Sequence, residues 1–221
     1  MGKKCRPYGY PMKYAFTGVI LAGGLNTRFS GNEKAFIKIG GVSILDRVFG
    51  AFKDLFAEII LVTNDPISYL KWDALVVTDL YPVRSALTGI HAGLYFAAYP
   101  HAFFSACDTP FLKKGVIEAI IQRVEPHLDI VIPETSAGLE PLCAVYSKRR
   151  ISVIEAHLAR NKLKIRQIFK GARITKIQES QLRQADPELL SFFNINTPED
   201  FAEAQTIEAE KGLTHEINAF D

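Results

Sequence analysis

The chain has 221 residues, of which 48% are hydrophobic, 23% charged and 11% aromatic, and this balance excludes a disordered or fibrous protein. At the usual ~150 residues per domain, the length favours one large domain. The formal net charge of +2 gives no indication of nucleic-acid binding, and no run of about 18 apolar residues predicts a membrane span. The three cysteines show neither metal-ligand spacing nor a pairing pattern, which favours a cytoplasmic protein.

The first half of the chain alternates between strand-like and helix-like segments. Residues 1–13 are predicted to form a loose tail, because they start basic but lack the apolar run of a secretory signal. Strands are predicted over residues 17–21, 59–62, 75–78, 103–106 and 130–132. Helices are predicted from Ser43, as the cap, through an apolar face from Ile44 to Phe56, and over residues 87–98 and 113–124. Because these strands are apolar throughout, they indicate a mostly parallel sheet covered by helices on both faces.

The second half is less regular, and its segments are predicted to extend the same sheet. Strands are expected at residues 142–146, 173–177 and 192–195, with a helix over residues 149–158. Thr197 as cap and Pro198 at the first helical position predict one more helix. The sequence therefore predicts an α/β fold with a single domain over residues 14–221.

One segment has a strongly uneven charge. Residues 148–176 contain ten Lys or Arg and one acid, Glu155, whereas the remainder of the chain is net negative. Two interpretations stay open for this stretch. It is either a solvated helix face with a lysine-rich linker, or a basic rim that attracts a phosphorylated substrate or an acidic protein partner.

Several common motifs are absent from the sequence. It contains no G-x-G-x-x-G dinucleotide fingerprint, no P-loop, no G-x-S-x-G and no H-E-x-x-H. These absences leave the glycine-containing segment after the first apolar strand as the main candidate for a site.

That segment is suited to binding phosphates. Gly23 and Gly24 let backbone N–H groups approach phosphate oxygens closely, and Arg28 and Lys34 add positive charge. A loop that leaves the carboxyl end of a parallel strand is also where open α/β sheets bind ligands. The alternative is a glycine-rich turn with two exposed cations.

Two aspartates are expected at the same edge of the sheet. Asp79 follows the strand at residues 75–78, and Asp108 follows the strand at residues 103–106. A carboxylate beside bound phosphates needs a divalent cation between them or a hydrogen bond to a base or sugar, and Mg²⁺ commonly takes one or two carboxylates with phosphate oxygens. The alternatives are a turn aspartate at Asp79 and a helix cap at Asp108.

The segment LAGGLNTRFSGNEKA resembles the signature of the molybdenum cofactor nucleotidyltransferases. The later segments ACDTP, EPLCAVY and NINTPED resemble other landmarks of that family in the same order, from about Thr17 to Gln205. The similarity is greatest to the guanylyltransferases of the family. It implies a single Rossmann-like domain, similar to nucleotide-diphospho-sugar transferases.

The resemblance also implies a reaction and its residues. The reaction is transfer of GMP from GTP, with Mg²⁺, to the terminal phosphate of molybdopterin or its molybdenum form, with release of pyrophosphate. By this match, Lys34 holds the triphosphate, Asp108 binds Mg²⁺ and Asp79 helps to bind the guanosine. Further contacts are expected from the backbone of Leu21, Ala22 and Gly23, from Asn64, and, on the pterin side, from Asn194 and Asn196. A molybdoenzyme or a cofactor-insertion protein is the expected partner, with no nucleic acid and no membrane.

The sequence departs from the family pattern in the glycine loop, which bears on loop geometry, and at residues 85–89, which bear on base choice. Asn26, Phe29 and Glu33 stand where the family usually has Ser, Met and Asp, and residues 85–89 read S-A-L-T-G in place of G-P-L-x-G. Two alternatives therefore stay open: a relative that uses CTP or a sugar-phosphate acceptor, and a non-catalytic carrier of the cofactor.

Overall fold

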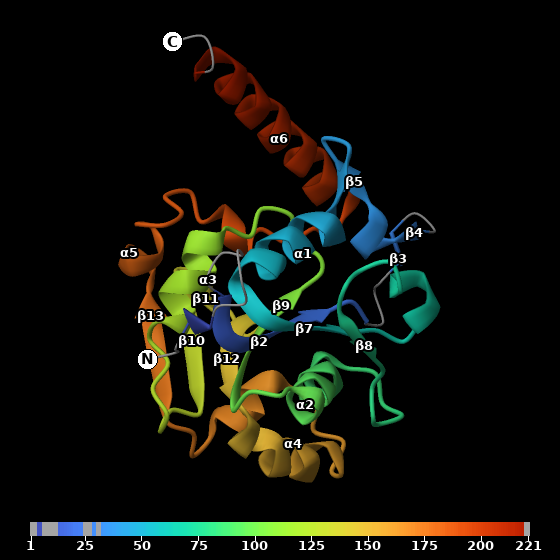
Figure 1. Ribbon diagram of the computed structural model, residues 1–221, viewed down its shortest axis with the longest axis vertical. Helices are drawn as coiled ribbons and strands as arrows, with labels where there is room; N and C mark the ends of the chain where they lie inside the picture. The colour runs from blue at the N-terminus through green and yellow to red at the C-terminus, as the bar shows by residue number, and fades with distance from the viewer. Residues whose placement is uncertain (1–3, 6–12, 24–27, 30–31, 219–221) are drawn as a thin grey trace.

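The computed structural model describes residues 4–5, 13–23, 28–29 and 32–218, with side chains for residues 13–23 and 34–210 (Figure 1). A mixed sheet runs through the molecule in the order β11-β10-β12-β9-β2-β7-β8, and β1 and β13 pair with β2 and β10. Its strands are β1 (Lys4–Cys5), β2 (Lys13–Leu21), β7 (Phe56–Val62), β8 (Leu75–Val77), β9 (His101–Ala106), β10 (Ile130–Thr135), β11 (Gly138–Leu139), β12 (Cys143–Ser147) and β13 (Ile174–Gln178). Strands β9, β2, β7 and β8 are parallel neighbours, whereas β12 runs antiparallel to both β9 and β10.

Helices cover both faces of this sheet, as the apolar strands predict. In Figure 1, α1 (Ile44–Leu55) and α3 (Lys114–Ile121) lie on one side, and α2 (Ala86–Phe96) and α4 (Ile151–Leu158) on the other. The remaining helices are α5 (Glu179–Leu182) and α6 (Pro198–Asn218). The short elements are η1 (Lys34–Phe36), η2 (Pro66–Tyr69), η3 (Lys148–Arg150), η4 (Ile165–Phe169), η5 (Leu190–Phe192) and the hairpins β3 (Arg28–Phe29) with β4 (Asn32–Glu33) and β5 (Lys38–Ile39) with β6 (Val42–Ser43).

Successive strand residues pack into two separate cores. Val19 and Phe104 lie in the core with α2 and α4, while Ile20 and Phe103 lie in the core with α1 and α3, and all four side chains are fully buried. A Cβ added at Gly93 would lie 2.7 Å from both Phe104 and Val19, so this glycine lets α2 approach the sheet closely. The α/β fold predicted from the apolar strands is therefore confirmed.

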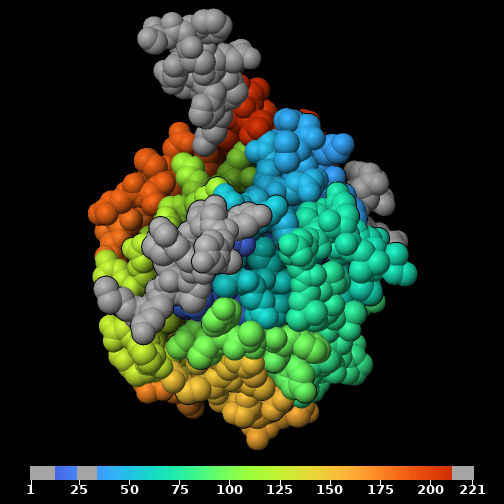
Figure 2. All heavy atoms as spheres, viewed as in Figure 1, coloured from blue at the N-terminus to red at the C-terminus, as the bar shows by residue number. Residues whose placement is uncertain are grey.

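The edge of the molecule beside β8 is formed by a short, irregular segment. Figure 2 shows η2 and β8 covering the right-hand side of the viewed face, next to the residues of α1, with α2 and α4 below.

No helix in the described part of the chain is both long and apolar enough to cross a membrane.

Two predicted elements are wrong, and the reasons are local. Phe56 does not end α1. It begins β7, and in that strand its side chain is fully buried in the core. No strand forms at residues 192–195. There the left-handed residue Leu189 precedes η5, and the Ile195 N–H donates to the Asp108 carbonyl (3.0 Å), which ties this segment to the loop after β9 and away from a sheet edge.

The helix starts agree better with the prediction. Ser43 accepts a hydrogen bond from the Asp46 N–H (3.1 Å) at the start of α1, and α6 begins at Pro198. The Asp200 carboxylate accepts hydrogen bonds from the N–H groups of Asn196 (2.7 Å) and Thr197 (2.8 Å). Two residues of the predicted tail, Lys4–Cys5, pair antiparallel with β2, and most of the remaining tail lies outside the described residues.

Candidate functional site

A cavity of about 490 Å³ opens at the carboxyl ends of the parallel strands, a size typical of ligand sites. The cavity is lined by residues that follow four neighbouring strands. They are Ala22 and Gly23 after Leu21, the last residue of β2, Thr63 and Asn64 after β7, Asp79 after β8, and Cys107 and Asp108 after β9. Lys34 and Asn196 complete one end, and Arg84, Ser85 and Gly89 the other. The structure thus brings together Gly23, Lys34 and both aspartates that the sequence places at this edge.

The backbone that leaves β2 is held on two sides. The Ala22 N–H donates to the Val62 carbonyl (2.8 Å), and the buried Tyr69 hydroxyl donates to the Ala22 carbonyl (3.3 Å). A Cβ at Gly23 would lie 3.2 Å from the Asn64 side-chain nitrogen, a tighter approach than most residues tolerate. The absence of a side chain at Gly23 therefore keeps the backbone close to the next strand.

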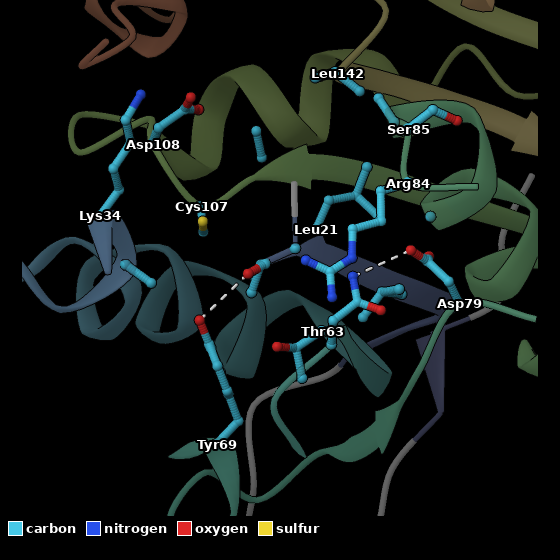
Figure 3. Close-up of a pocket in the computed structure, with 18 of the residues that line it drawn as sticks. Leu21, Lys34, Thr63, Tyr69, Asp79, Arg84, Ser85, Cys107, Asp108 and Leu142 are labelled. Atoms are coloured by element: carbon cyan, nitrogen blue, oxygen red, sulfur yellow. Dashed lines mark hydrogen bonds between the residues drawn. The ribbon is translucent and has the colours of Figure 1, made fainter. Parts of the chain in front are cut away.

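Lys34 and Asp108 lie at one end of the cavity (Figure 3), where Asn196 is hydrogen-bonded to Lys34. Lys34 is buried, and its Nζ donates to the Asn196 Oδ1 (3.1 Å). The Asp108 Oδ1 atom is buried and accepts no hydrogen bond from any described residue. Burial raises the pKa of Asp108, and the nearby positive charge of Lys34 opposes that shift. This end combines a buried cation with a carboxylate oxygen that lacks a protein donor.

Asp79, Asn64 and Arg84 form the opposite end. The Asn64 Nδ2 donates to the Asp79 Oδ2 (3.2 Å), which holds the carboxylate in place. Burial raises the pKa of Asp79, while the Asn64 hydrogen bond and the charge of Arg84 lower it. Figure 3 shows the Arg84 guanidinium turned into the cavity, between Leu21 and Asp79. Sequence reasoning missed Arg84. The signal available was its place directly before Ser85, the cap of α2.

Local capping explains why α2 begins at this position. The Ser85 hydroxyl accepts from the Thr88 N–H (3.2 Å), and the Thr88 hydroxyl accepts from the Ser85 N–H (3.0 Å), forming a capping box. The helix therefore starts beside the cavity and leaves Arg84 as the last residue of the connecting segment.

The remaining predicted residues lie elsewhere or cannot be located. The Asn194 amide donates to the Phe192 carbonyl (3.0 Å), and Asn194 does not line the cavity. Gly24 lies outside the described residues, and so does the side chain of Arg28. Asp108 is not a helix cap, since α3 begins at Lys114 with Lys113 in the cap position.

The donor set near Asp108 fits a cation that is shared with a ligand. Among the described residues, no group of three or more His, Cys, Asp or Glu side chains is placed to hold a metal ion. Mg²⁺ is usually bound by one or two carboxylates together with substrate phosphates and water. The enclosed Asp108 Oδ1 without a protein donor fits that arrangement.

Half of the basic stretch at residues 148–176 has structural partners. Lys148 and Arg150 donate to backbone carbonyls, Arg149 and Arg173 bind Asp129, and Lys176 binds Glu134. None of the ten basic residues lines the cavity. For these five the structural interpretation accounts for the charge.

The chain is similar to molybdenum cofactor guanylyltransferases in both sequence and structure. Over residues 18–179 it matches the family described as MobA-like NTP transferase domain. It is 48% identical over 191 residues to the molybdenum cofactor guanylyltransferase of Desulfosudis oleivorans (86% of this chain, 95% of that protein). It is 36% identical to a probable molybdenum cofactor guanylyltransferase of Pelotomaculum thermopropionicum (91% and 97%). The crystal structure of molybdopterin-guanine dinucleotide biosynthesis protein A from Archaeoglobus fulgidus superposes with a TM-score of 0.77 at 27% identity (88% and 100%).

Proposed function

The chain belongs to the MobA-like family of molybdenum cofactor guanylyltransferases, and from that premise we propose that it transfers GMP from GTP to the terminal phosphate of molybdopterin or its molybdenum form. The products are the guanine dinucleotide form of the cofactor and pyrophosphate. The observation that carries the proposal is the single cavity shared by Gly23, Lys34, Asp79 and Asp108. A cavity of about 490 Å³ with a cation and a carboxylate at each end is suited to an extended nucleotide.

In this proposal the Lys34 end receives the triphosphate. An ammonium group has three hydrogens to donate, and Asn196 takes one of them at 3.1 Å. The other two are directed by the same hydrogen bond toward phosphate oxygens. The Ala22 N–H and carbonyl are already bonded to Val62 and Tyr69, so the backbone that leads into Gly23 is held in place before the nucleotide binds.

A divalent cation is the second component at this end, and we assign it to Mg²⁺. Asp108 would hold the ion with its enclosed Oδ1 atom, and the ion would neutralise charge on the phosphates. Lys34 then lies close enough to influence both the carboxylate and the phosphates.

The chemistry needs positioning more than acid–base groups. A phosphate oxygen of the acceptor attacks the α-phosphorus, and the bond to the pyrophosphate oxygen breaks in line with it. Because the attacking oxygen is already anionic, no side chain has to remove a proton. Lys34 and the loop amides stabilise the charge that grows on the departing pyrophosphate.

The direct test is pyrophosphate release. Purified protein with GTP, Mg²⁺ and molybdopterin should release pyrophosphate and form the guanine dinucleotide. The same mixture with CTP, or with a sugar phosphate in place of molybdopterin, should not. Pyrophosphate release with CTP but not with GTP would identify a cytidylyl-transferring relative. If no nucleotide led to pyrophosphate release, the protein would be a carrier. Either result contradicts the proposal.

Lys34→Met tests the assignment of the triphosphate end. We expect mainly a higher KM for GTP, by on the order of tenfold or more, because a charge-assisted contact contributes about 1.5–3 kcal/mol. The KM for molybdopterin should change less. Steady-state kinetics with each substrate varied in turn measures both. Lys53→Met, on the exposed face of α1, is the matched control. An unchanged response to GTP concentration would contradict the assignment.

A further inference from the structure

We propose that Arg84 selects guanine over the other bases, by donating from its guanidinium group to O6 and N7 of the GTP base. The inference rests on the proposed function, since it takes the triphosphate to lie at the Lys34 end. It assigns the choice of base, which the sequence leaves open, to a residue outside the family's motif.

The first observation is that Arg84 faces the cavity without a protein acceptor. Among the described residues, no side chain or carbonyl accepts a hydrogen bond from Arg84, and its positive charge attracts the Asp79 carboxylate. Four arginines outside the cavity are occupied by carboxylates of the protein. Arg47 binds Glu208, Arg149 and Arg173 bind Asp129, and Arg183 binds Glu179. Arg84 is thus an exposed guanidinium on a cavity wall with its donors available to a ligand.

The second observation is the charge at each end of the cavity. Figure 3 shows Lys34 and Asp108 on one side and Arg84 with Asp79 on the other. A triphosphate at the Lys34 end leaves the opposite end for the base. There Asp79 would repel phosphate and offset the charge of Arg84, so the pair is poorly suited to a second anion. A neutral ligand with both donors and acceptors matches it better.

The third observation is the chemistry of the pair. Guanine presents O6 and N7, two neighbouring acceptors, on one edge, and arginine binds that edge with two parallel hydrogen bonds. Guanine also carries N1–H and N2–H₂ donors, which suit a carboxylate. Asn64 donates to Asp79 Oδ2, and no described residue donates to its Oδ1. Adenine has an N6 donor in place of O6 and would face Arg84 donor to donor, while cytosine has no N7.

The experiment measures the Kd values of GTP, 7-deaza-GTP, ATP and CTP, each with Mg²⁺, by calorimetry. The proteins are the wild type, Arg84→Gln, Arg84→Lys and a control, Arg123→Gln, which removes an exposed arginine outside the cavity. Arg84→Gln should weaken GTP by about 5- to 150-fold and leave ATP and CTP nearly unchanged. Arg84→Lys should resemble Arg84→Gln, because lysine keeps the charge but not the two-pronged geometry. Arg123→Gln should match the wild type.

The nucleotide analogue gives an independent check on the contact. 7-Deaza-GTP lacks N7, so the wild type should bind it about 2- to 13-fold more weakly than GTP. Arg84→Gln should bind the two nucleotides equally, since the variant lacks the guanidinium from which N7 accepts a hydrogen bond.

Each alternative result has a definite meaning. Equal weakening of all four nucleotides by Arg84→Gln would place Arg84 on the phosphates, and no weakening of GTP would remove it from the site; both overturn the inference. If the wild type releases pyrophosphate from GTP while Arg84→Gln keeps the full preference for GTP, only this inference fails. If the wild type shows no preference for GTP, both it and the proposed function fail. Unfolding midpoints of the variants should match the wild type, because Arg84 contributes no hydrogen bond within the described protein.

Discussion

Asp108 follows β9 and Asp129 precedes β10, two strands with only β12 between them, and the protein surrounds the two carboxylates in opposite ways. Asp129 precedes β10 and is buried. Its two carboxylate oxygens accept from the Arg173 backbone N–H (2.9 Å) and from the side chains of Arg173 and Arg149. Asp108 follows β9, and its Oδ1 is enclosed without a donor. Burial raises the pKa of both, but at Asp129 the arginine hydrogen bonds outweigh it and hold the pKa well below its usual range.

The difference separates a structural carboxylate from one that is available to a ligand. Arg173 lies 44 residues from Asp129 along the chain, so their contact joins β10 to β13. At Asp108, Lys34 lies nearby but its hydrogen bond goes to Asn196. A buried carboxylate oxygen that the fold leaves without a donor is unfavourable in the free protein, and a bound cation removes that cost.

The largest effect should come from Asp108→Asn, which keeps the shape of the side chain and removes its charge. We expect turnover to fall at least 10²- to 10³-fold, about 3–4 kcal/mol, as is typical when one preorganised electrostatic contact is lost. Stability should not fall, because the variant removes a desolvated charge whose Oδ1 atom has no protein donor. Pyrophosphate release and urea unfolding measure the two properties.

A matched control separates the charge from its position. Asp73→Asn removes an exposed carboxylate outside the cavity, so its turnover and stability should equal those of the wild type. Near-normal turnover of Asp108→Asn in saturating Mg²⁺ would show that Asp108 is not the metal-binding residue.

The next effect in size should come from Asp129→Asn, which we expect to lower stability and to leave turnover unchanged. The amide replaces one acceptor oxygen with a donor that faces two arginines. Charged hydrogen bonds contribute about 1.5–3 kcal/mol each, and the half-exposed arginines reduce that figure, so we expect the free energy of unfolding to fall by about 2–3 kcal/mol. Turnover per folded molecule should stay unchanged. A stable variant with low turnover would mean that Asp129 takes part in the reaction after all.

The sequence predicts the position of Asp108 but not its contrast with Asp129. Both Asp79 and Asp108 are located because each follows an apolar run, and parallel strands bring their carboxyl ends to one edge. Asp129 also adjoins an apolar run, but its role depends on Arg149 and Arg173, which lie 20 and 44 residues away. Contacts over such separations leave no periodic pattern in the sequence.

Contacts between residues far apart in the chain also explain the other differences between the sequence predictions and the structure. Arg84 lies in an irregular segment, so only the three-dimensional structure shows that it faces the cavity. The basic stretch reads as one charged surface in the sequence, yet the fold pairs half of it with carbonyls and carboxylates. At residues 192–195 an apolar run predicts a strand. In the structure no strand forms there, and the Ile195 N–H donates to the Asp108 carbonyl.

The smallest expected effect is a change in how stability depends on pH. A raised pKa means that native Asp108 binds protons more readily than the unfolded chain, whose aspartates titrate near 3.8. The wild type should therefore lose stability relative to Asp108→Asn as the pH rises from 3.8 through the folded pKa. The lowered pKa of Asp129 has the reverse sign. Its stabilisation is complete above 3.8 and is lost as the pH falls below 3.8 toward the folded pKa.

Urea unfolding of the wild type and both Asn variants between pH 3 and 7 tests this prediction. The raised pKa of Asp79 is common to all three proteins and cancels when their stabilities are subtracted. The difference in unfolding free energy between the wild type and Asp108→Asn should change only above pH 3.8. The difference between the wild type and Asp129→Asn should change only below pH 3.8. If both differences changed on the same side, the two carboxylates would share one environment, and the assignment of Asp108 as the open ligand and Asp129 as the structural anchor would be wrong. If they change on opposite sides, then the number of donors around each carboxylate, and not burial alone, decides which one is available to a cation.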